Sequence, residues 1–120
     1  MDPEQPDPAQ DAAQKVTRKL ATRLARSKGR PVAGVVYAAL DTDTLPLTSF
    51  AARAAARDRE VQTKLAALLE AIQRWEAQHG QSLPLEVRPD SASIALTAPP
   101  EVFTVLAGTS AAAVLDVDPD

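Results

Sequence analysis

The chain has 120 residues, the length of one domain, and a formal net charge of −3 at pH 7. Hydrophobic residues make up 45% of it, but alanine supplies many of these and aromatic residues only 3%, so we expect a thin core. The absence of cysteine excludes disulfides, thiolate catalysis and cysteine-ligated metal centres. No apolar run approaches the roughly 20 residues that span a bilayer, and the acidic start is unlike a signal peptide. We therefore expect a cytoplasmic protein with no membrane partner, and the abundance of alanine and arginine with no asparagine indicates a bacterial one.

The charge is divided into three blocks. Residues 1–11 carry four acids and no base, a charge of −4, and contain three prolines, which predicts a disordered acidic tail. Residues 12–57 carry nine bases against Asp41 and Asp43, a charge of +7, and residues 58–120 carry −6. We expect a single α+β domain over residues 12–117 and a short acidic tail at 118–120. Crowded positive charge of this kind usually meets a partner of opposite sign.

A basic amphipathic helix is predicted over about residues 9–28. At 100° per residue, Val16, Leu20 and Leu24 share one side and the basic residues lie on the other. Gly29 and Pro31 end the helix. The bases of this helix and of the turn after it are the candidate binding residues: Lys15, Arg18, Lys19, Arg23, Arg26, Lys28 and Arg30.

Residues 31–40 are ambiguous. The alanines and Pro31 favour a helix, whereas Val35, Val36 and an interior Gly34 favour a buried strand, to which we lean slightly. The composition of residues 41–46 predicts a loop.

A long helix is predicted from a cap at Thr48 or Ser49 to about His79, with Gly80 just past its end. About 30 residues at 1.5 Å each give roughly 45 Å, so the helix either breaks near residues 57–59 or protrudes. Apolar residues recur in its second half at spacings of 4, 3, 4 and 3: Val61, Leu65, Leu68, Ile72 and Trp75. We expect this seam to pack against the sheet or the first helix of the same chain, and a homodimer interface is the alternative.

Beyond Gly80 the period changes to two. Residues 83–87 and 92–97 predict a hairpin around a turn at residues 88–91, with Leu85 opposite Ile94. Residues 99–108 favour a short helix over a strand, and residues 112–117 predict a last strand. The predicted fold is thus α+β, with a basic N-terminal helix and one long helix packed on a small antiparallel sheet of two to four strands.

Little in the sequence suggests catalysis. The sole histidine, His79, lies in the last turn of the long helix, where a cation or hydrogen-bond donor is favoured without any catalytic role. Asp41 and Asp43 resemble the opening of a calcium loop but lack its turn glycine and its final glutamate. We expect no enzyme, no catalytic residues, no metal and no cofactor.

The charge pattern instead favours a binding protein. A row of bases can neutralise nucleic-acid phosphates, so a nucleic-acid-associated or regulatory role is the first hypothesis. The bases have no aromatic residues interleaved with them, which disfavours stacking on single strands. The alternative is a protein–protein interaction adaptor or chaperone-like dimer whose basic helix pairs with acidic protein segments. Both hypotheses include a homodimer.

Overall fold

The computed structural model describes residues 14–40 and 49–118. The predicted tail at 1–11, the 41–46 loop and the last two residues of the 118–120 tail therefore lie outside the described residues. In chain order the elements are helix α2 (Arg18–Arg26), strand β1 (Val32–Ala38), helix α3 (Phe50–His79), strand β2 (Leu85–Arg88), the 3₁₀ turn η2 (Pro89–Ser91), strand β3 (Ser93–Ala98), helix α4 (Pro100–Ala107) and strand β4 (Ala112–Val117).

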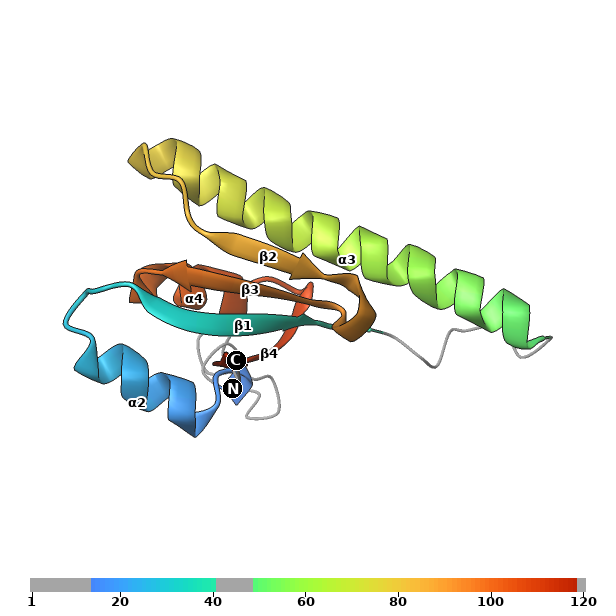
Figure 1. Cartoon of the computed structure of the whole chain (residues 1–120), viewed down its shortest axis with the longest axis horizontal. Coiled ribbons are helices and arrows are strands. Elements are labelled where there is room, and N and C mark those ends of the chain that lie inside the picture. The colour runs from blue at the N-terminus through green and yellow to red at the C-terminus, as the bar shows by residue number, and fades with distance from the viewer. Residues whose placement is uncertain (1–13, 41–48, 119–120) are drawn as a thin grey trace, which may run out of the picture.

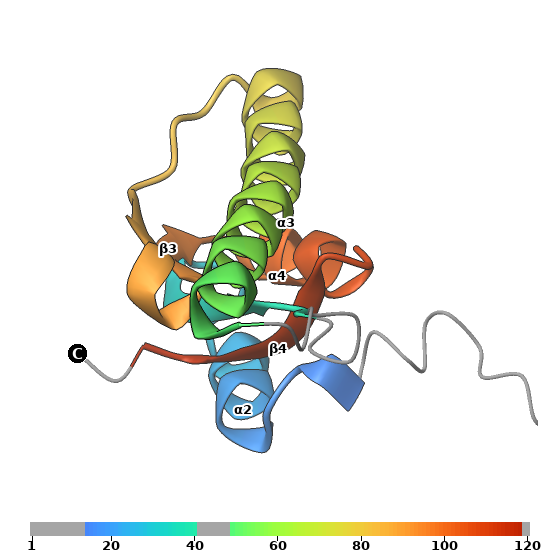
Figure 2. The same ribbon diagram turned by 90° about the vertical axis from the view of Figure 1, so that its right-hand side faces the viewer.

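The four strands form one antiparallel sheet in the order β2-β3-β1-β4 (Figure 1). From β1 to β4 the chain follows the β-α-β-β-α-β order of the split βαβ, or ferredoxin-like, arrangement, with α2 added in front. Helices α3 and α4 lie on the same side of the strands, and α2 lies beyond β4 (Figure 2). The α+β prediction of helices packed on a small antiparallel sheet is confirmed.

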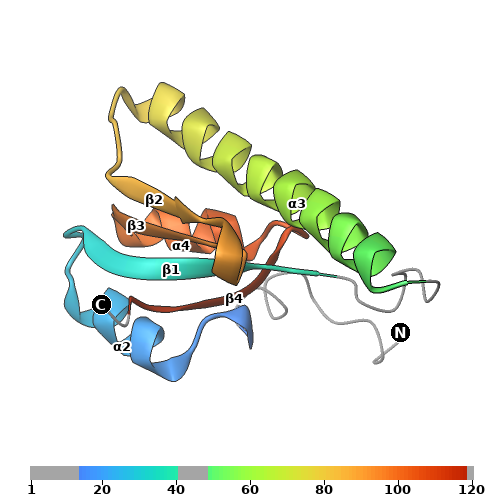
Figure 3. The ribbon, with the colours of Figure 1, turned by 45° about the vertical axis from the view of Figure 1, so that its right-hand side comes forward.

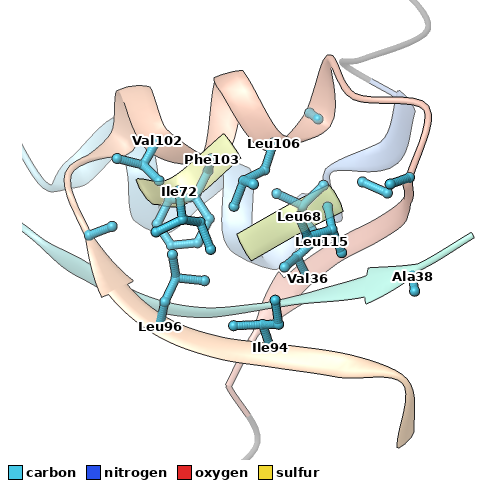
Figure 4. Close-up of a cluster of buried hydrophobic side chains, with 14 of the residues drawn as sticks. Val36, Ala38, Leu68, Ile72, Ile94, Leu96, Val102, Phe103, Leu106 and Leu115 are labelled. Atoms are coloured by element: carbon cyan, nitrogen blue, oxygen red, sulfur yellow. The ribbon is translucent and has the colours of Figure 1, made fainter. Parts of the chain in front are cut away.

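The core lies between the sheet and the two helices above it. Val36 of β1 pairs with Ile94 of β3 and with Leu115 of β4, so these side chains stand in line across three strands. Phe103 of α4 and Leu68 of α3 meet this row from the helix side (Figure 4). Burial of this one face supplies most of the favourable free energy of a domain this small.

Helix α3 is a single continuous helix of 30 residues, so the alternative of a break near residues 57–59 is wrong. Ser49 caps its start by accepting a hydrogen bond from the N–H of Ala52, and Gly80 ends it in the left-handed conformation with φ of 62°. The five seam residues are the buried residues of this helix and belong to the core cluster: Val61, Leu65, Leu68, Ile72 and Trp75. The seam thus packs within one chain, and homodimer formation stays a prediction.

No helix formed by the described residues covers the other face of the sheet (Figure 1). Arg88 of β2 reaches Asp118, which follows β4, at 3.3 Å, and it also lies 3.3 Å from Glu86. The Asp118 carboxylate raises the pKa of the Arg88 guanidinium above its already high value. Because β2 and β4 are the two outer strands, the pair formed by Arg88 and Asp118 connects opposite edges of the sheet.

The structure settles one ambiguity and corrects two predictions. Residues 32–38 form the strand β1, which agrees with the slight preference for a strand over a helix in residues 31–40. The hairpin register is displaced by two residues, since Leu85 pairs with Leu96 while Val87 pairs with Ile94. The apolar face survives the displacement because a shift of two keeps each side chain on its own side. The basic helix does not run from residue 9 through to residue 28: α2 begins at Arg18, because the chain just before it bridges to β4 instead of continuing the helix.

Candidate nucleic-acid interface

Helix α2 is fixed at its start by Thr17. The hydroxyl of Thr17 accepts a hydrogen bond from the N–H of Leu20 at 3.3 Å and donates one to Oδ1 of Asp116 at 2.7 Å. The backbone N–H of Thr17 also donates to the carbonyl oxygen of Leu115 at 2.9 Å. These bonds cap the helix and attach it to the edge strand β4, so its first turn has a defined position on the sheet.

The apolar side of α2 decides which way its charges point. Leu20 is fully buried in the core cluster, and Leu24 is half-buried against it. At 100° per residue, Lys19, Arg23 and Arg26 then face outward, and all three are exposed. Helix α2 lies along the β4 side of the sheet (Figure 3). Its bases are therefore presented to solvent on that side.

The turn after α2 brings two more bases to the same place. Ser27 ends the helix, and Lys28 and Gly29 take left-handed conformations with φ of 54° and 83°. Such backbone angles turn the chain sharply, which returns it towards the sheet at Pro31. Lys28 and Arg30 thereby join Arg26 around one hollow.

Two adjoining hollows run along this surface. One, of about 580 Å³, includes Arg23, Arg26, Lys28 and Arg30 in its lining, above Pro31 and Ala33. The other, of about 410 Å³, is lined by Arg18, Lys19, Thr22, Arg23, Arg26 and Val117. Because the two hollows share Arg23 and Arg26, the bases form one continuous strip. Among the residues that the structure describes, no carboxylate lines either hollow. We call this strip the basic surface: Arg18, Lys19, Arg23, Arg26, Lys28 and Arg30.

Six of the seven predicted binding residues thus lie together, and Lys15 does not line either hollow. Its Nζ donates to the carbonyl oxygen of Thr109 at 2.9 Å, so Lys15 ties the segment before α2 to the turn that follows α4. We assign it a structural contact. Lys15 lies before Thr17, outside α2, which explains why it does not join the bases of that helix at the hollows.

The basic surface is not neutralised by the part of the chain that the structure describes, where no ion pair involves any of its six residues. A nearby acid, Asp116, is already engaged: the hydroxyl of Thr17 and the backbone N–H of Val117 hold the pKa of its carboxyl below the usual value, and Lys19 contributes less. With respect to the described residues, the strip therefore carries a positive potential that favours an anionic ligand.

Catalytic and metal sites find no comparable support. His79 stacks on Trp75 with ring centroids 4.1 Å apart, and its Nδ1 lies 2.9 Å from the carbonyl oxygen of Trp75. The carboxylate of Glu101 is 3.9 Å from its Nε2, and no second carboxylate forms an ion pair with it within residues 14–40 and 49–118. The same residues contain no cluster of three potential metal ligands, and no helix among them is both long and apolar enough to cross a membrane.

Sequence reasoning missed one surface. Phe50, the first residue of α3, lines a hollow of about 400 Å³ together with Arg53, Ala54 and Arg57. The spacing of three, four and seven residues puts them on one helix face. The signal was present in the sequence, but it emerges only when the helix is known to run unbroken past the sheet.

Comparisons of the chain with protein-family models, with curated proteins and with solved structures give no match.

Proposed function

We propose that the protein binds nucleic acid by contacting backbone phosphates through the basic surface. The observation that carries this proposal is the pair of adjoining hollows, to which residues 14–40 and 49–118 contribute six bases and no acid. Clustered guanidinium and ammonium groups gain affinity for a polyanion by displacing its condensed counterions. Guanidinium groups can also contact two phosphate oxygens at once.

The size of α2 sets the number of contacts. Its 9 residues extend over about 14 Å at 1.5 Å per residue. One strand of a DNA duplex carries a phosphate every ~3.4 Å along its axis, so about four phosphates face the helix. Lys28 and Arg30 extend the surface beyond the helix end.

Binding of this kind holds mainly the backbone, because the arginine and lysine side chains can read guanine in the major groove but no other base. Among the side chains of the basic surface none is Asn, Gln or an aromatic residue, the types that pair with adenine or stack on bases. Phosphate contacts alone carry no sequence information. We therefore expect similar affinities for duplexes of unrelated sequence, which suits an accessory or regulatory role on nucleic acid.

The test is the salt dependence of duplex binding, measured by fluorescence anisotropy with a labelled 20-base-pair duplex. With four to six phosphate contacts, affinity should fall by about 10²- to 10³-fold between 50 and 200 mM salt. The variant R23E should bind at least about tenfold more weakly, with a salt slope smaller by about 1.

Arg74 offers a matched control for R23E. It is exposed, lies on the outer side of α3 and pairs only with Glu70 one turn away among the described residues. The variant R74E changes the net charge by the same amount, yet should bind the duplex as the wild type does. Salt-independent binding, or full affinity after reversal of Lys19, Arg23 and Arg26 together to glutamate, would refute the proposal.

An acidic protein segment is the second candidate ligand. The exposed side chains of Pro31 and Ala33 in the larger hollow give an apolar contact that phosphates do not need but that an acidic peptide can use. Competition against the labelled duplex distinguishes the two ligands. If a polyglutamate peptide displaces the labelled duplex at a lower concentration of negative charges than an unlabelled duplex does, the result would favour the adaptor role.

A further inference from the structure

The first third of α3 is not used by the core. The buried residues of this helix begin at Val61, and none of residues 50–60 is buried. This end of the helix reaches past the ends of the strands (Figure 1). A helix that extends beyond its own domain exposes side chains that the fold itself does not require.

Phe50 is the outstanding side chain of this end. It is 90% exposed, whereas the other exposed large hydrophobic residues of the described chain reach at most the 45% of Val105. An aromatic side chain that stays in water forgoes the favourable free energy of burial. A ligand that covers the ring would recover it.

The charges around Phe50 are positive. Arg53 and Arg57 line the same hollow one and two turns along, and neither takes part in an ion pair within the described ranges. Arg57 also borders a neighbouring hollow that contains Asp58 and Asp90, without an ion pair to either. An aromatic ring beside guanidinium groups matches the chemistry of a nucleobase with its flanking phosphates.

We propose that this end of α3 is a second nucleic-acid contact, at which an unpaired base stacks on Phe50 while Arg53 and Arg57 hold the neighbouring phosphates. The inference rests on the proposed function, since it assumes that nucleic acid is the ligand, and it adds a preference for single-stranded segments. Bases inside a duplex already stack on each other and cannot cover the ring. This contact is separate from the basic surface, because α2 and the start of α3 lie at different ends of the molecule (Figures 1 and 3).

The charge of this face argues against a second copy of the chain as its occupant. A symmetric pairing through Phe50 would bring the Arg53 and Arg57 side chains of two copies together, and like charges in contact are unfavourable. A single strand of nucleic acid avoids that repulsion and supplies the phosphates that the guanidinium groups can bind.

The test compares a 15-nucleotide oligothymidine with a blunt duplex of the same length. The variant F50A should lose about 5- to 150-fold in affinity for the single strand, the effect of one lost base–aromatic stack, and should bind the duplex unchanged. The matched control V105A removes a partly exposed apolar side chain from α4 and should leave both affinities as they are.

A direct readout comes from F50W. Its new tryptophan is exposed and should be quenched when the oligothymidine is added, whereas the native Trp75 is buried and should respond little. Loss of single-strand binding in R23E with no effect of F50A would overturn this inference and leave the proposed function standing. Binding that neither R23E nor F50A weakens would overturn both. A wild-type dimer in sedimentation that becomes a monomer in F50A would assign the face to a second copy and overturn the inference.

Discussion

A methyl group added at Gly34 should destabilise the fold through a single contact. Gly34 lies in the middle of β1, and a Cβ built there would be 2.6 and 3.0 Å from two ring carbons of Phe103 and 3.2 Å from the carbonyl oxygen of Asp116. Ordinary contacts begin at 3.4 Å, so the ring would have to shift by most of an ångström, and it is fully buried. Overpacking of this kind costs about 1–3 kcal/mol. Alanine returns about 0.5–1 kcal/mol through lower chain entropy, so we expect a net loss of about 1–2 kcal/mol for G34A.

Urea denaturation followed by circular dichroism measures this loss. The matched control is G108A, because the nearest atom to a Cβ at Gly108 is 3.4 Å away and the substitution should change stability by less than about 0.5 kcal/mol. Adding F103L to G34A makes room for the methyl group, so the double variant should be less destabilised than the two single changes summed. If G34A is as stable as the wild type, or if its effect adds to that of F103L, then Phe103 does not pack on β1 as described.

Two further predictions concern the attachment of α2. The variant T17V removes the helix cap and the hydrogen bond to Asp116. It should lower the free energy of unfolding, measured by urea titration, by about 1–3 kcal/mol, and it should weaken duplex binding. An unchanged duplex affinity would show that the position of α2 does not matter for binding. Because the folded-state pKa of Asp116 is lowered, its ionised form contributes stability above the unfolded pKa of about 3.9, and this stability is lost as pH falls through the lower folded value. Thermal unfolding should therefore show D116N to be less stable than the wild type at pH 7 and the difference to shrink below about pH 4; a difference that stays constant with pH would contradict this.

Much of the fold was predictable because its periodic signals are strong. The spacing of Leu65, Leu68 and Ile72 identified the buried face of α3, and the strand predicted over residues 112–117 has the bounds of β4. Ser49 and Gly80 marked the ends of α3 through side-chain and backbone chemistry that acts locally.

The errors arose where distant contacts decide the local structure. Val16 and Thr17 suit a helix by pattern, but pairing with Leu115 draws them to the sheet edge. The hairpin register differs from the predicted one because Ala92 adopts a left-handed conformation, with φ of 51°. Alanine rarely takes this conformation, so the sequence of the turn does not predict it.

The candidate site was predictable in composition and not in geometry. The helical spacing of apolar and basic residues predicted that Arg23 and Arg26 lie on the outer face of the helix, and both are exposed in the structure. The convergence of Lys28 and Arg30 on the same hollow depends on the backbone of the turn, and the exposure of Phe50 depends on where the sheet ends under α3.

The attachment of α2 to β4 has a consequence for synthesis. Thr17 is bonded to Asp116, which follows it by 99 positions, and to its neighbour Leu115. During synthesis the residues of the basic surface therefore leave the ribosome well before β4, to which Thr17 attaches α2. The bonds that fix the start of α2 can form only after Leu115 and Asp116 have been made. If the basic surface binds nucleic acid as proposed, a nascent chain would lack the fixed position of α2 for this binding until β4 has joined the sheet.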